Sequence, residues 1–519
     1  MAEEEPRTPL LEQGPRVNGS LRPPAQQQNH LHHPAEEPEE APLLQRTWIE
    51  SKKLWRIVGP AIFTRTSIYG MNVVTQAFVG HLGDLELAAI SIAITVVVGF
   101  NYGFLVHFFS PPTLSPQQLL PCMWNDTILK FGMASAMETL CGQAYGAREY
   151  PMLGIYMQRS FGVMFLCALL LLPTYILATP ILKLVGETDE IAELAGWITR
   201  LLIPLQFSFV LSFPTQRFLQ CQLKNVIIAW IAGTTLLIHV FLSWLLVSYF
   251  GFGLVGAAVA LNIGWWVPPI CQLLYTVCGG CPETWTGLSW QGLMGLWEFT
   301  KLSIASGVML CLENWYYRIL VILTGNLSDA EIALDALSVC MNINGWEMMI
   351  PLAFFAGTGV RVSNELGAGN GKGARFATIV SVITSTVIGL FFWALIVILH
   401  NKFALLFTSS AVVLAATSKL AVLLAFTILL NSLFTSVCRF SFSTERPPSA
   451  YVSTLSNWLV VVVVQGIWGG MIGGTAVQTL ILGVITIRCD WEKEAQKAYH
   501  RVDRWKVPDT TDKSPSGTP

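Results

Sequence analysis

Residues 299–327 read FTKLSIASGVMLCLENWYYRILVILTGNL, a mostly apolar run that is long enough to cross a lipid bilayer as a helix. Glu313 falls near the middle of this run, so we expect its carboxylate near the middle of the membrane. A charge at that depth is costly, and ionisable residues found there usually face a bundle interior or a water-filled cavity. The run therefore predicts a membrane-spanning fold, and it marks Glu313 as a candidate functional residue.

Aromatic side chains accompany Glu313 on one face of this helix. Tyr316 and Tyr317 follow it by three and four residues, a spacing that stacks side chains along a helix. An acid with aromatic neighbours suits a proton and an organic cation alike. The alternative is a structural carboxylate paired with Arg318, but that base lies five positions on, away from the Glu313 face.

The composition of the whole chain agrees with a membrane protein. Of 519 residues, 53% are hydrophobic and 12% are charged, with a mean hydropathy of +0.54; soluble domains carry about twice that charged fraction. The net charge of −2 and the apolar body leave no basic surface for nucleic acid. Eleven scattered cysteines predict no disulfide framework, and the pair Cys278 and Cys281 lacks the second ligand pair of a zinc site. We expect no metal or other cofactor.

The apolar runs predict an all-α polytopic membrane protein with two pseudo-symmetric six-helix lobes. Residues 1–46, rich in Pro, Gln, Glu and His, should form a disordered cytosolic tail. The N-terminal lobe then covers residues 47–277, the C-terminal lobe covers 278–490, and 491–519 form a second cytosolic tail. Twelve transmembrane helices are expected, near residues 54–79, from 85 onward, 156–178, 195–216, 226–250, 254–277, 299–325, 331–358, 376–400, 411–437, 450–464 and 466–487.

Charges in the loops predict the orientation of these spans. Lys and Arg gather before the first span, after several even-numbered spans and in the C-terminal tail, whereas the opposite loops hold little beyond Lys183 and Lys402. By the positive-inside rule both termini are cytosolic. Residues 39–44, EEAPLL, match an acidic dileucine sorting signal, so the expected location is the vacuolar membrane or the plasma membrane.

Two segments of the first lobe recur in the second. GHLGDLELA at residues 80–88 matches GNLSDAEIA at 325–333, and ETLCGQAYGAR at 138–148 matches ELGAGNGKGAR at 365–375. Each pair falls at the same place relative to the first two spans of its lobe, which predicts two lobes of the same orientation. Internal repeats are typical of secondary transporters, whose substrate site lies between the repeats near mid-membrane.

No signature of ATP hydrolysis or of enzyme catalysis accompanies the repeat. The glycine-rich segment departs from a P-loop, because Leu366 replaces its first Gly and Gly373 stands where Ser or Thr should follow Lys372. Neither an H-E-x-x-H motif nor a nucleophile elbow is found. We therefore expect a transporter driven by an ion gradient rather than an enzyme. A passive channel or facilitator for small organic solutes is the alternative.

The repeat motifs and the Glu313 segment resemble one transporter family. Residues 80–83 (GHLG), 138–147 (ETLCGQAYGA), 311–316 (CLENWY) and 361–370 (RVSNELGAGN) are similar to those of MATE (multidrug and toxic compound extrusion) transporters, above all the plant DETOXIFICATION branch. The resemblance implies a proton-coupled antiporter of organic solutes, and we expect it to be a monomer. It also implies that an acid on the seventh helix carries the proton, and that acid corresponds to Glu313.

Further polar residues complete the predicted site. Glu347 and Asp335, on the span after Glu313, are additional candidates for proton or substrate coupling. Asp335 should lie at the same depth as Arg318, so a structural ion pair between them is the expected role, with proton relay as the alternative. Asn342 and Asn344 are two positions apart on a helix, so at most one of them faces Glu313. The expected lining of the substrate cavity is Asn314, Tyr316, Tyr317, Asn342 and Asn344.

Two segments depart from the family pattern. Residues 106–131 interrupt a helix that is continuous in similar proteins, and their four prolines cannot continue it. Residues 435–465 replace a full eleventh span with an apolar piece of about 23 Å, short of a roughly 30 Å hydrocarbon core. Both segments indicate an aberrant gene model, so an inactive variant is a further alternative.

The insertion can be tested directly on the transcript. Amplification across codons 106–131 should yield mostly a product that lacks them, because the sequence on either side continues one helix. A single abundant message that retains these codons would identify the insertion as an authentic part of the protein.

Overall fold

The structure, a computed structural model, describes residues 42–94, 137–185, 188–294, 296, 330–403, 411–443 and 467–505. All of them belong to one unit of the chain, Pro42–Pro519. Helices make up nearly all of the described ranges, and no strand occurs within them. The predicted all-α fold class is thereby confirmed.

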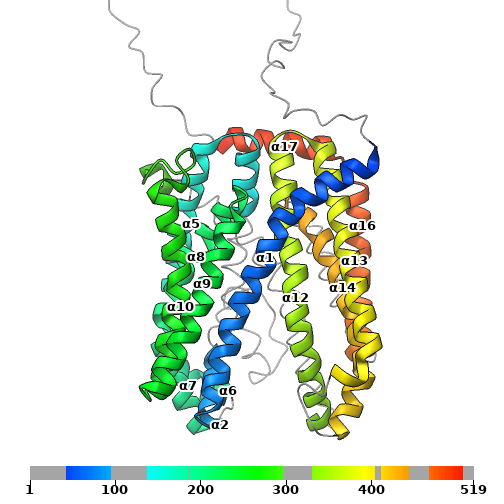
Figure 1. The fold of residues 1–519 in the computed structure, drawn as a ribbon. Coiled ribbons are helices and arrows are strands. Elements are labelled where there is room, and N and C mark those ends of the chain that lie inside the picture. Colours follow the sequence, from blue (N-terminus) through cyan, green and yellow to red (C-terminus); the bar gives the residue numbers. More distant parts are fainter. Residues whose placement is uncertain are drawn as a thin grey trace, which may run out of the picture. The chain divides into compact units, whose positions relative to one another are not determined.

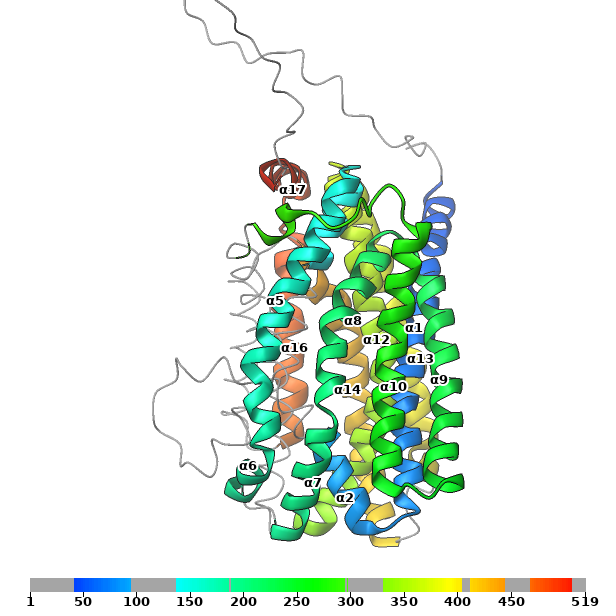
Figure 2. The ribbon, with the colours of Figure 1, turned by 90° about the vertical axis from the view of Figure 1, so that its left-hand side faces the viewer.

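The helices of the first half run between two ends of the bundle (Figures 1 and 2). We call these the α17 end, where helix α17 lies, and the α2 end, which carries helix α2. The first-half elements are α1 (Leu43–Gly80), α2 (Asp84–Ile92), helical residues 137–146, α5 (Tyr150–Ile176), α6 (Ala178–Val185), α7 (Asp189–Leu201), α8 (Ile203–Cys221), α9 (Asn225–Ser243), the π-helix η5 (Trp244–Tyr249), α10 (Gly253–Tyr275) and the π-helix η6 (Thr276–Gly280).

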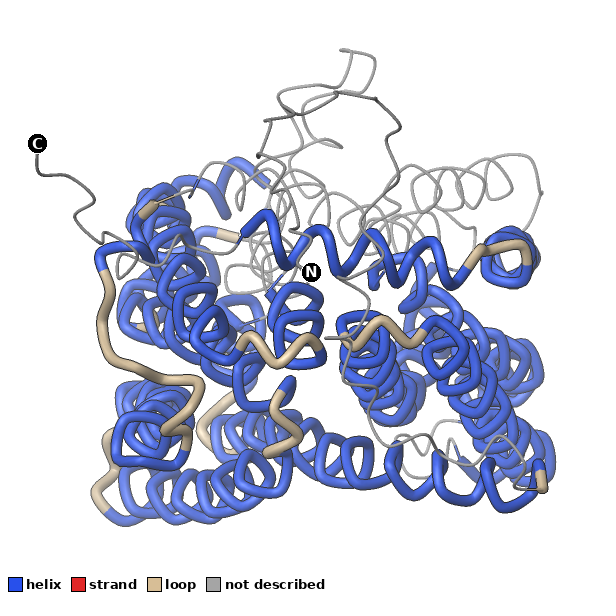
Figure 3. The backbone as a smooth tube through the Cα atoms, turned by 90° about the horizontal axis from the view of Figure 1, so that it is seen from above, coloured by secondary structure: helices blue, strands red, loops and turns tan. Residues whose placement is uncertain are grey.

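The second half is a group of long helices followed by a short one. A segment that contains the 3₁₀-helix η7 (Trp290–Leu293) leads into it. Figure 3 shows the described unit from the α17 end. The second-half helices are α12 (Ala330–Gly367), α13 (Gly371–Phe403), α14 (Ala411–Ser443), α16 (Ile467–Ile487) and α17 (Trp491–Trp505).

Most described helices lie where apolar runs predict them, but their ends differ. Helix α1 begins at Leu43 rather than Leu54, and α12 continues to Gly367. A further helix, α17, occupies part of the segment expected to be a cytosolic tail. Its sequence is polar overall, so a search for long apolar runs passes over it. Apolar side chains nevertheless recur along one of its faces, and packing against the bundle buries them.

One predicted span, near residues 195–216, is broken in the structure. Helices α7 and α8 meet at an angle of 48°. Pro204 lies in the first turn of α8, where its missing N–H costs nothing, but its ring prevents α7 from continuing through it. Gln206 then donates from Nε2 to the Ala168 carbonyl of α5 at 3.1 Å, which fixes the broken span to its neighbour.

The described residues include only some of the expected membrane spans. Within the described ranges, five helices are long and apolar enough to cross a membrane, and seven if two bent helix pairs each count as one span. The expected spans near 299–325 and 450–464 lie outside the described residues, as does the insertion 106–131. The count of twelve therefore stays a prediction.

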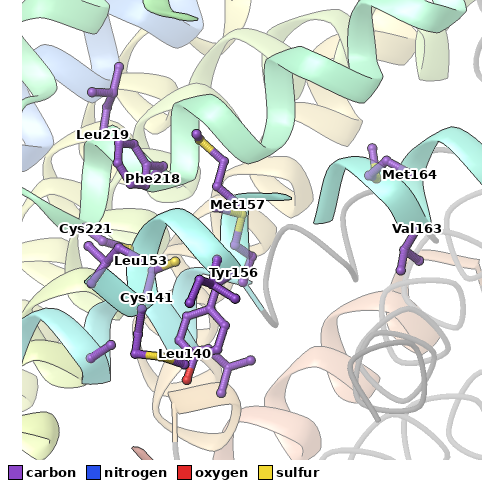
Figure 4. Close-up of a cluster of buried hydrophobic side chains, with 14 of the residues drawn as sticks. Leu140, Cys141, Leu153, Tyr156, Met157, Val163, Met164, Phe218, Leu219 and Cys221 are labelled. Atoms are coloured by element: carbon purple, nitrogen blue, oxygen red, sulfur yellow. The ribbon is translucent and has the colours of Figure 1, made fainter. Parts of the chain in front are cut away.

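The largest buried cluster in the first half lies toward the α17 end. Leu140 and Cys141 come from helical residues 137–146, Tyr156 comes from α5, and Phe218 comes from α8 (Figure 4). None of these side chains is more than 2% exposed. The cluster therefore packs helical residues 137–146, α5 and α8 against one another.

A buried histidine ties α1 to α9 and α10. His239 of α9 places Nε2 2.9 Å from Thr75 Oγ1 on α1 and Nδ1 3.2 Å from the Ala260 carbonyl on α10. Thr75 and His239 are at most 2% exposed. Because both ring nitrogens face polar atoms, this contact fixes the lower part of α1 against α9 and α10 (Figure 1).

The packing of Phe218 gives a test of the cluster in Figure 4. Phe218 is fully buried, whereas Phe241 on α9 is 56% exposed on the outer face. Phe218→Ala should cost about 3 kcal/mol by leaving a cavity, and should lower the midpoint of thermal unfolding in detergent. Phe241→Ala is the matched control and should change the midpoint little. Equal midpoints for the two variants would contradict the packing described above.

Candidate functional site

The two halves meet along α1 and α12, near the α17 end. Leu54, Val58 and Ala61 of α1 are buried against Ala353 and Phe354 of α12. From this contact the two helices diverge toward the α2 end (Figure 1). The most closely packed part of the contact therefore lies toward the α17 end.

A buried ion pair joins the halves within this contact. Arg361 of α12 donates from Nε to Glu50 Oε1 at 2.8 Å and from a terminal nitrogen to Glu50 Oε2 at 3.0 Å. The same guanidinium donates to Glu365 Oε1 at 2.7 Å. Arg361 is 9% exposed and Glu50 is 6% exposed, so solvent screens the pair weakly. Two parallel hydrogen bonds also fix the relative direction of α1 and α12.

Three glycines allow the halves to approach closely at the α17 end. A Cβ atom on Gly142 would lie 2.6 Å from the Ser363 Cβ, and one on Gly146 would overlap the Asn364 backbone. From the other side, a Cβ on Gly367 would lie 2.6 Å from the Gln143 Cα. Small residues are what membrane helices use where their backbones touch, because van der Waals contact is the main attraction available there.

The residues of this glycine contact come from both copies of the repeat. Gly142 and Gly146 belong to the first copy, and Gly367 belongs to the second. In its better-satisfied orientation, the Asn364 amide donates to the Gly142 carbonyl at 2.9 Å. The repeat motifs therefore form the surface on which the halves close, rather than a site for phosphate.

The two repeat carboxylates both lie in ion pairs. Glu138, which is fully buried, pairs with Arg217 of α8 at 2.8 Å inside the first half. Its counterpart Glu365 pairs with Arg361 at 2.7 Å inside the second half. These pairings stabilise the helix ends at the closing surface and leave substrate contact to other acids.

A second polar cluster lies inside the C-terminal half. Glu347 of α12 is 6% exposed, and neither of its carboxylate oxygens has a hydrogen bond of normal geometry to a described residue. Asn344, one turn earlier on the same face, is 8% exposed. The Ser432 hydroxyl of α14 lies beside the Glu347 carboxylate, and Ser385 of α13 donates to the Ser432 carbonyl at 2.8 Å. Three helices thus surround one buried acid.

This cluster lies close to the contact between the halves. Trp346, next to Glu347 in the chain, packs edge to face against Tyr69 of α1 with ring centroids 4.7 Å apart. The Glu347 cluster thus lies one residue away in the chain from a contact between α12 and α1.

The predicted site residues are only partly described. Glu313, Asn314, Tyr316 and Tyr317 lie outside the described residues, and so do the side chains of Asp335 and Asn342, whose backbones belong to α12. Asn344 and Glu347 are described, and the helix brings them onto one buried face. Ser385 and Ser432 were not predicted from the sequence. The polar pair Asn431–Ser432 inside an apolar run was the available signal for Ser432.

Metal binding finds no support in the part of the chain that the structure describes. No group of three or more His, Cys, Asp or Glu side chains there is arranged to hold a metal ion. Cys281 is buried with its sulfur 3.1 Å from the Lys224 ammonium, whereas Cys278 is exposed.

Comparison with known proteins adds independent information. The pattern of the MatE family matches residues 127–245 and 305–467. The chain is 57% identical over 487 residues to Protein DETOXIFICATION 27 of Arabidopsis thaliana, covering 91% of this chain and 95% of that protein. It is 52% identical over 478 residues to Protein DETOXIFICATION 26 of the same plant, covering 89% and 92%. The crystal structure of the eukaryotic MATE transporter AtDTX14 matches with a TM-score of 0.77 at 31% identity, covering 88% of this chain and 99% of that one.

The glycine contact predicts how the α17 end responds to added bulk. Gly146→Val places side-chain atoms where the Asn364 backbone lies, so the halves should separate at this end. Spin labels on Arg148→Cys and Arg375→Cys, with other reactive cysteines replaced by serine, should then report a longer distance by pulsed electron resonance. Gly59→Val is the control, because a Cβ on Gly59 meets nothing within 4 Å. Identical distances in the Gly146→Val variant and its parent would rule out a close contact here.

Proposed function

Because this chain belongs to the MatE family, the MATE transporters, we propose that it is a proton-coupled antiporter of organic solutes. It exports or sequesters xenobiotics and secondary metabolites, including organic cations and flavonoid-type compounds. Transport follows alternating access, in which the two halves open first at one end of the bundle and then at the other. Membership of a transporter family also argues against an enzyme.

The observation that carries proton coupling is the buried Glu347 carboxylate. A charge in an apolar bundle is costly without a partner, and uptake of a proton removes that cost. The oxygens of Ser432 and Asn344 nearby provide polar surroundings for either protonation state. A group that changes charge at this position is suited to couple a proton to a cationic or hydrogen-bonding solute.

Glu313 stays the expected primary coupling acid, with Glu347 and Asp335 as its partners in the same half. When ionised, the acid attracts a cationic or donor-bearing solute; when protonated, it releases that solute. Because one carboxylate serves both ligands, proton and solute bind in alternation. Mutual exclusion of this kind is what exchange of a proton for a solute requires.

The closed contact supports assignment of the conformation and the orientation. The Glu50–Arg361 pair and the glycine contact hold the halves together at the α17 end, and α1 and α12 diverge toward the α2 end, so we propose that the substrate path opens at the α2 end. The α17 end also carries basic residues, Arg148, Arg217, Lys224 and Arg375 among them, which assigns it to the cytosol by the positive-inside rule. We therefore propose that both termini are cytosolic and that a contact closed at the α17 end belongs to the outward-facing state.

The membrane to which the protein is delivered depends on the leucine pair at the start of α1. Leu43 and Leu44 are 70% and 86% exposed, so they are accessible to the cellular sorting machinery. We infer delivery to the vacuolar membrane, with the plasma membrane as the destination when this pair is lost.

Proton coupling can be tested in proteoliposomes under an imposed pH gradient, with a fluorescent organic cation such as ethidium as the probe. Glu313→Gln should abolish gradient-driven flux, since it keeps the shape of the side chain but fixes the uncharged form. Glu347→Gln should lower the flux at least tenfold, and Glu313→Asp should retain part of it. The control is Glu190→Gln, which alters an exposed acid on α7.

Two outcomes would redirect the proposal. Full gradient-driven flux in both Gln variants would remove these acids from coupling. Flux in the parent that runs down the solute gradient and ignores the pH gradient would support the passive facilitator instead. The assay should use both the chain as it stands and one without residues 106–131 and with a regular eleventh span, because activity only in the latter identifies an inactive variant.

A further inference from the structure

Helix α17 begins at a sharp corner after α16. The two helices are bent by 84° at the intervening residues. Asp490 forms the corner, because its side chain accepts a hydrogen bond from the Lys493 backbone N–H at 3.2 Å. This bond satisfies one of the free N–H groups at the start of the helix. The turn therefore directs α17 across the α17 end of the bundle instead of away from it (Figure 1).

The apolar face of α17 belongs to the second half. Trp491, Ala495 and Ala498 are buried together with Val362 and Leu366 of α12. The contact with α13 is closer still, since a Cβ on Gly371 would lie 2.7 Å from the Trp491 carbonyl oxygen. Helix α17 must therefore move with the second half as one body.

The far part of α17 reaches the first half. Arg501 donates from Nη1 to the Gln143 side-chain oxygen at 2.9 Å. Gln143 is fully buried in helical residues 137–146, and its backbone faces Gly367 in the glycine contact. One helix thus packs on one half and binds the other.

We propose that α17 is a strap that holds the two halves together at the α17 end and favours the state closed there. This inference rests on the proposed alternating access, because the Arg501–Gln143 bond must break whenever the halves separate at this end. A hydrogen bond that involves a charged donor contributes enough to change such an equilibrium about tenfold or more. Removing the strap should make opening at the α17 end easier.

The test measures conformation directly, without any transport. Spin labels on Arg148→Cys and Arg375→Cys report the separation of the halves in lipid nanodiscs, with other reactive cysteines replaced by serine. Arg501→Ala should raise the population of the longer distance about tenfold, and Arg501→Lys should raise it less, because the cation survives. Lys493→Ala is the control, since it removes an exposed cation from the same helix.

A double-variant cycle assigns the effect to this bond. If Arg501 acts through Gln143, Gln143→Ala should reproduce the shift, and adding Arg501→Ala should change it little further. An unchanged distance distribution in Arg501→Ala, or a fully additive double variant, would overturn the strap.

Transport measurements then separate the two proposals. In proteoliposomes under a pH gradient, a parent with no ethidium flux would count against the proposed function, while the distance measurement would still decide the strap. A parent with normal flux and no shift in Arg501→Ala would overturn the strap alone.

Discussion

The buried pair between Glu50 and Arg361 is the interaction on which the closed end of the bundle depends. A guanidinium removed from water must be paired, and here its two partners lie in different halves. Each member also has a partner on its own helix, since Glu365 contacts Arg361 at 2.7 Å and Lys53 lies 3.9 Å from Glu50. When the halves separate, neither charge is left alone. The pair can therefore open and close at a smaller cost than a buried ion pair usually carries.

The remaining contacts between the halves follow from this arrangement. The ion pair fixes the relative direction of α1 and α12, but it does not bring helix backbones into contact. The glycines of the repeat allow that close approach. Because lipid is as apolar as the helix surfaces, exact fit rather than hydrophobic burial holds membrane helices together. The motif that looks like a phosphate-binding loop in the sequence is, in the structure, a surface for another helix.

Apolar runs predicted α5, α9, α10 and α13 well, because length and hydropathy alone specify a membrane-crossing helix. They could not predict the break between α7 and α8, because it depends on where Pro204 falls relative to the packing of the two helices. They also passed over α17, because only one face of that helix is apolar. For the site, the cost of a charge inside the membrane made Glu347 a candidate, and the structure then placed Asn344 on the same buried face of α12. Ser385 and Ser432 come from other helices, and only the rotation of α13 and α14 brings them near. Glu313 stays a prediction.

The position of Arg501 after the described membrane helices has a consequence for biogenesis. Glu50 and the glycines of the first half are synthesised and inserted long before Arg361, and Arg501 leaves the ribosome after every described membrane helix. The first half must therefore wait in the membrane with its closing surface unmatched. Assembly of that surface is a late event, completed only when α17 folds across it, so a ribosome that stops before α17 leaves inserted helices without this contact.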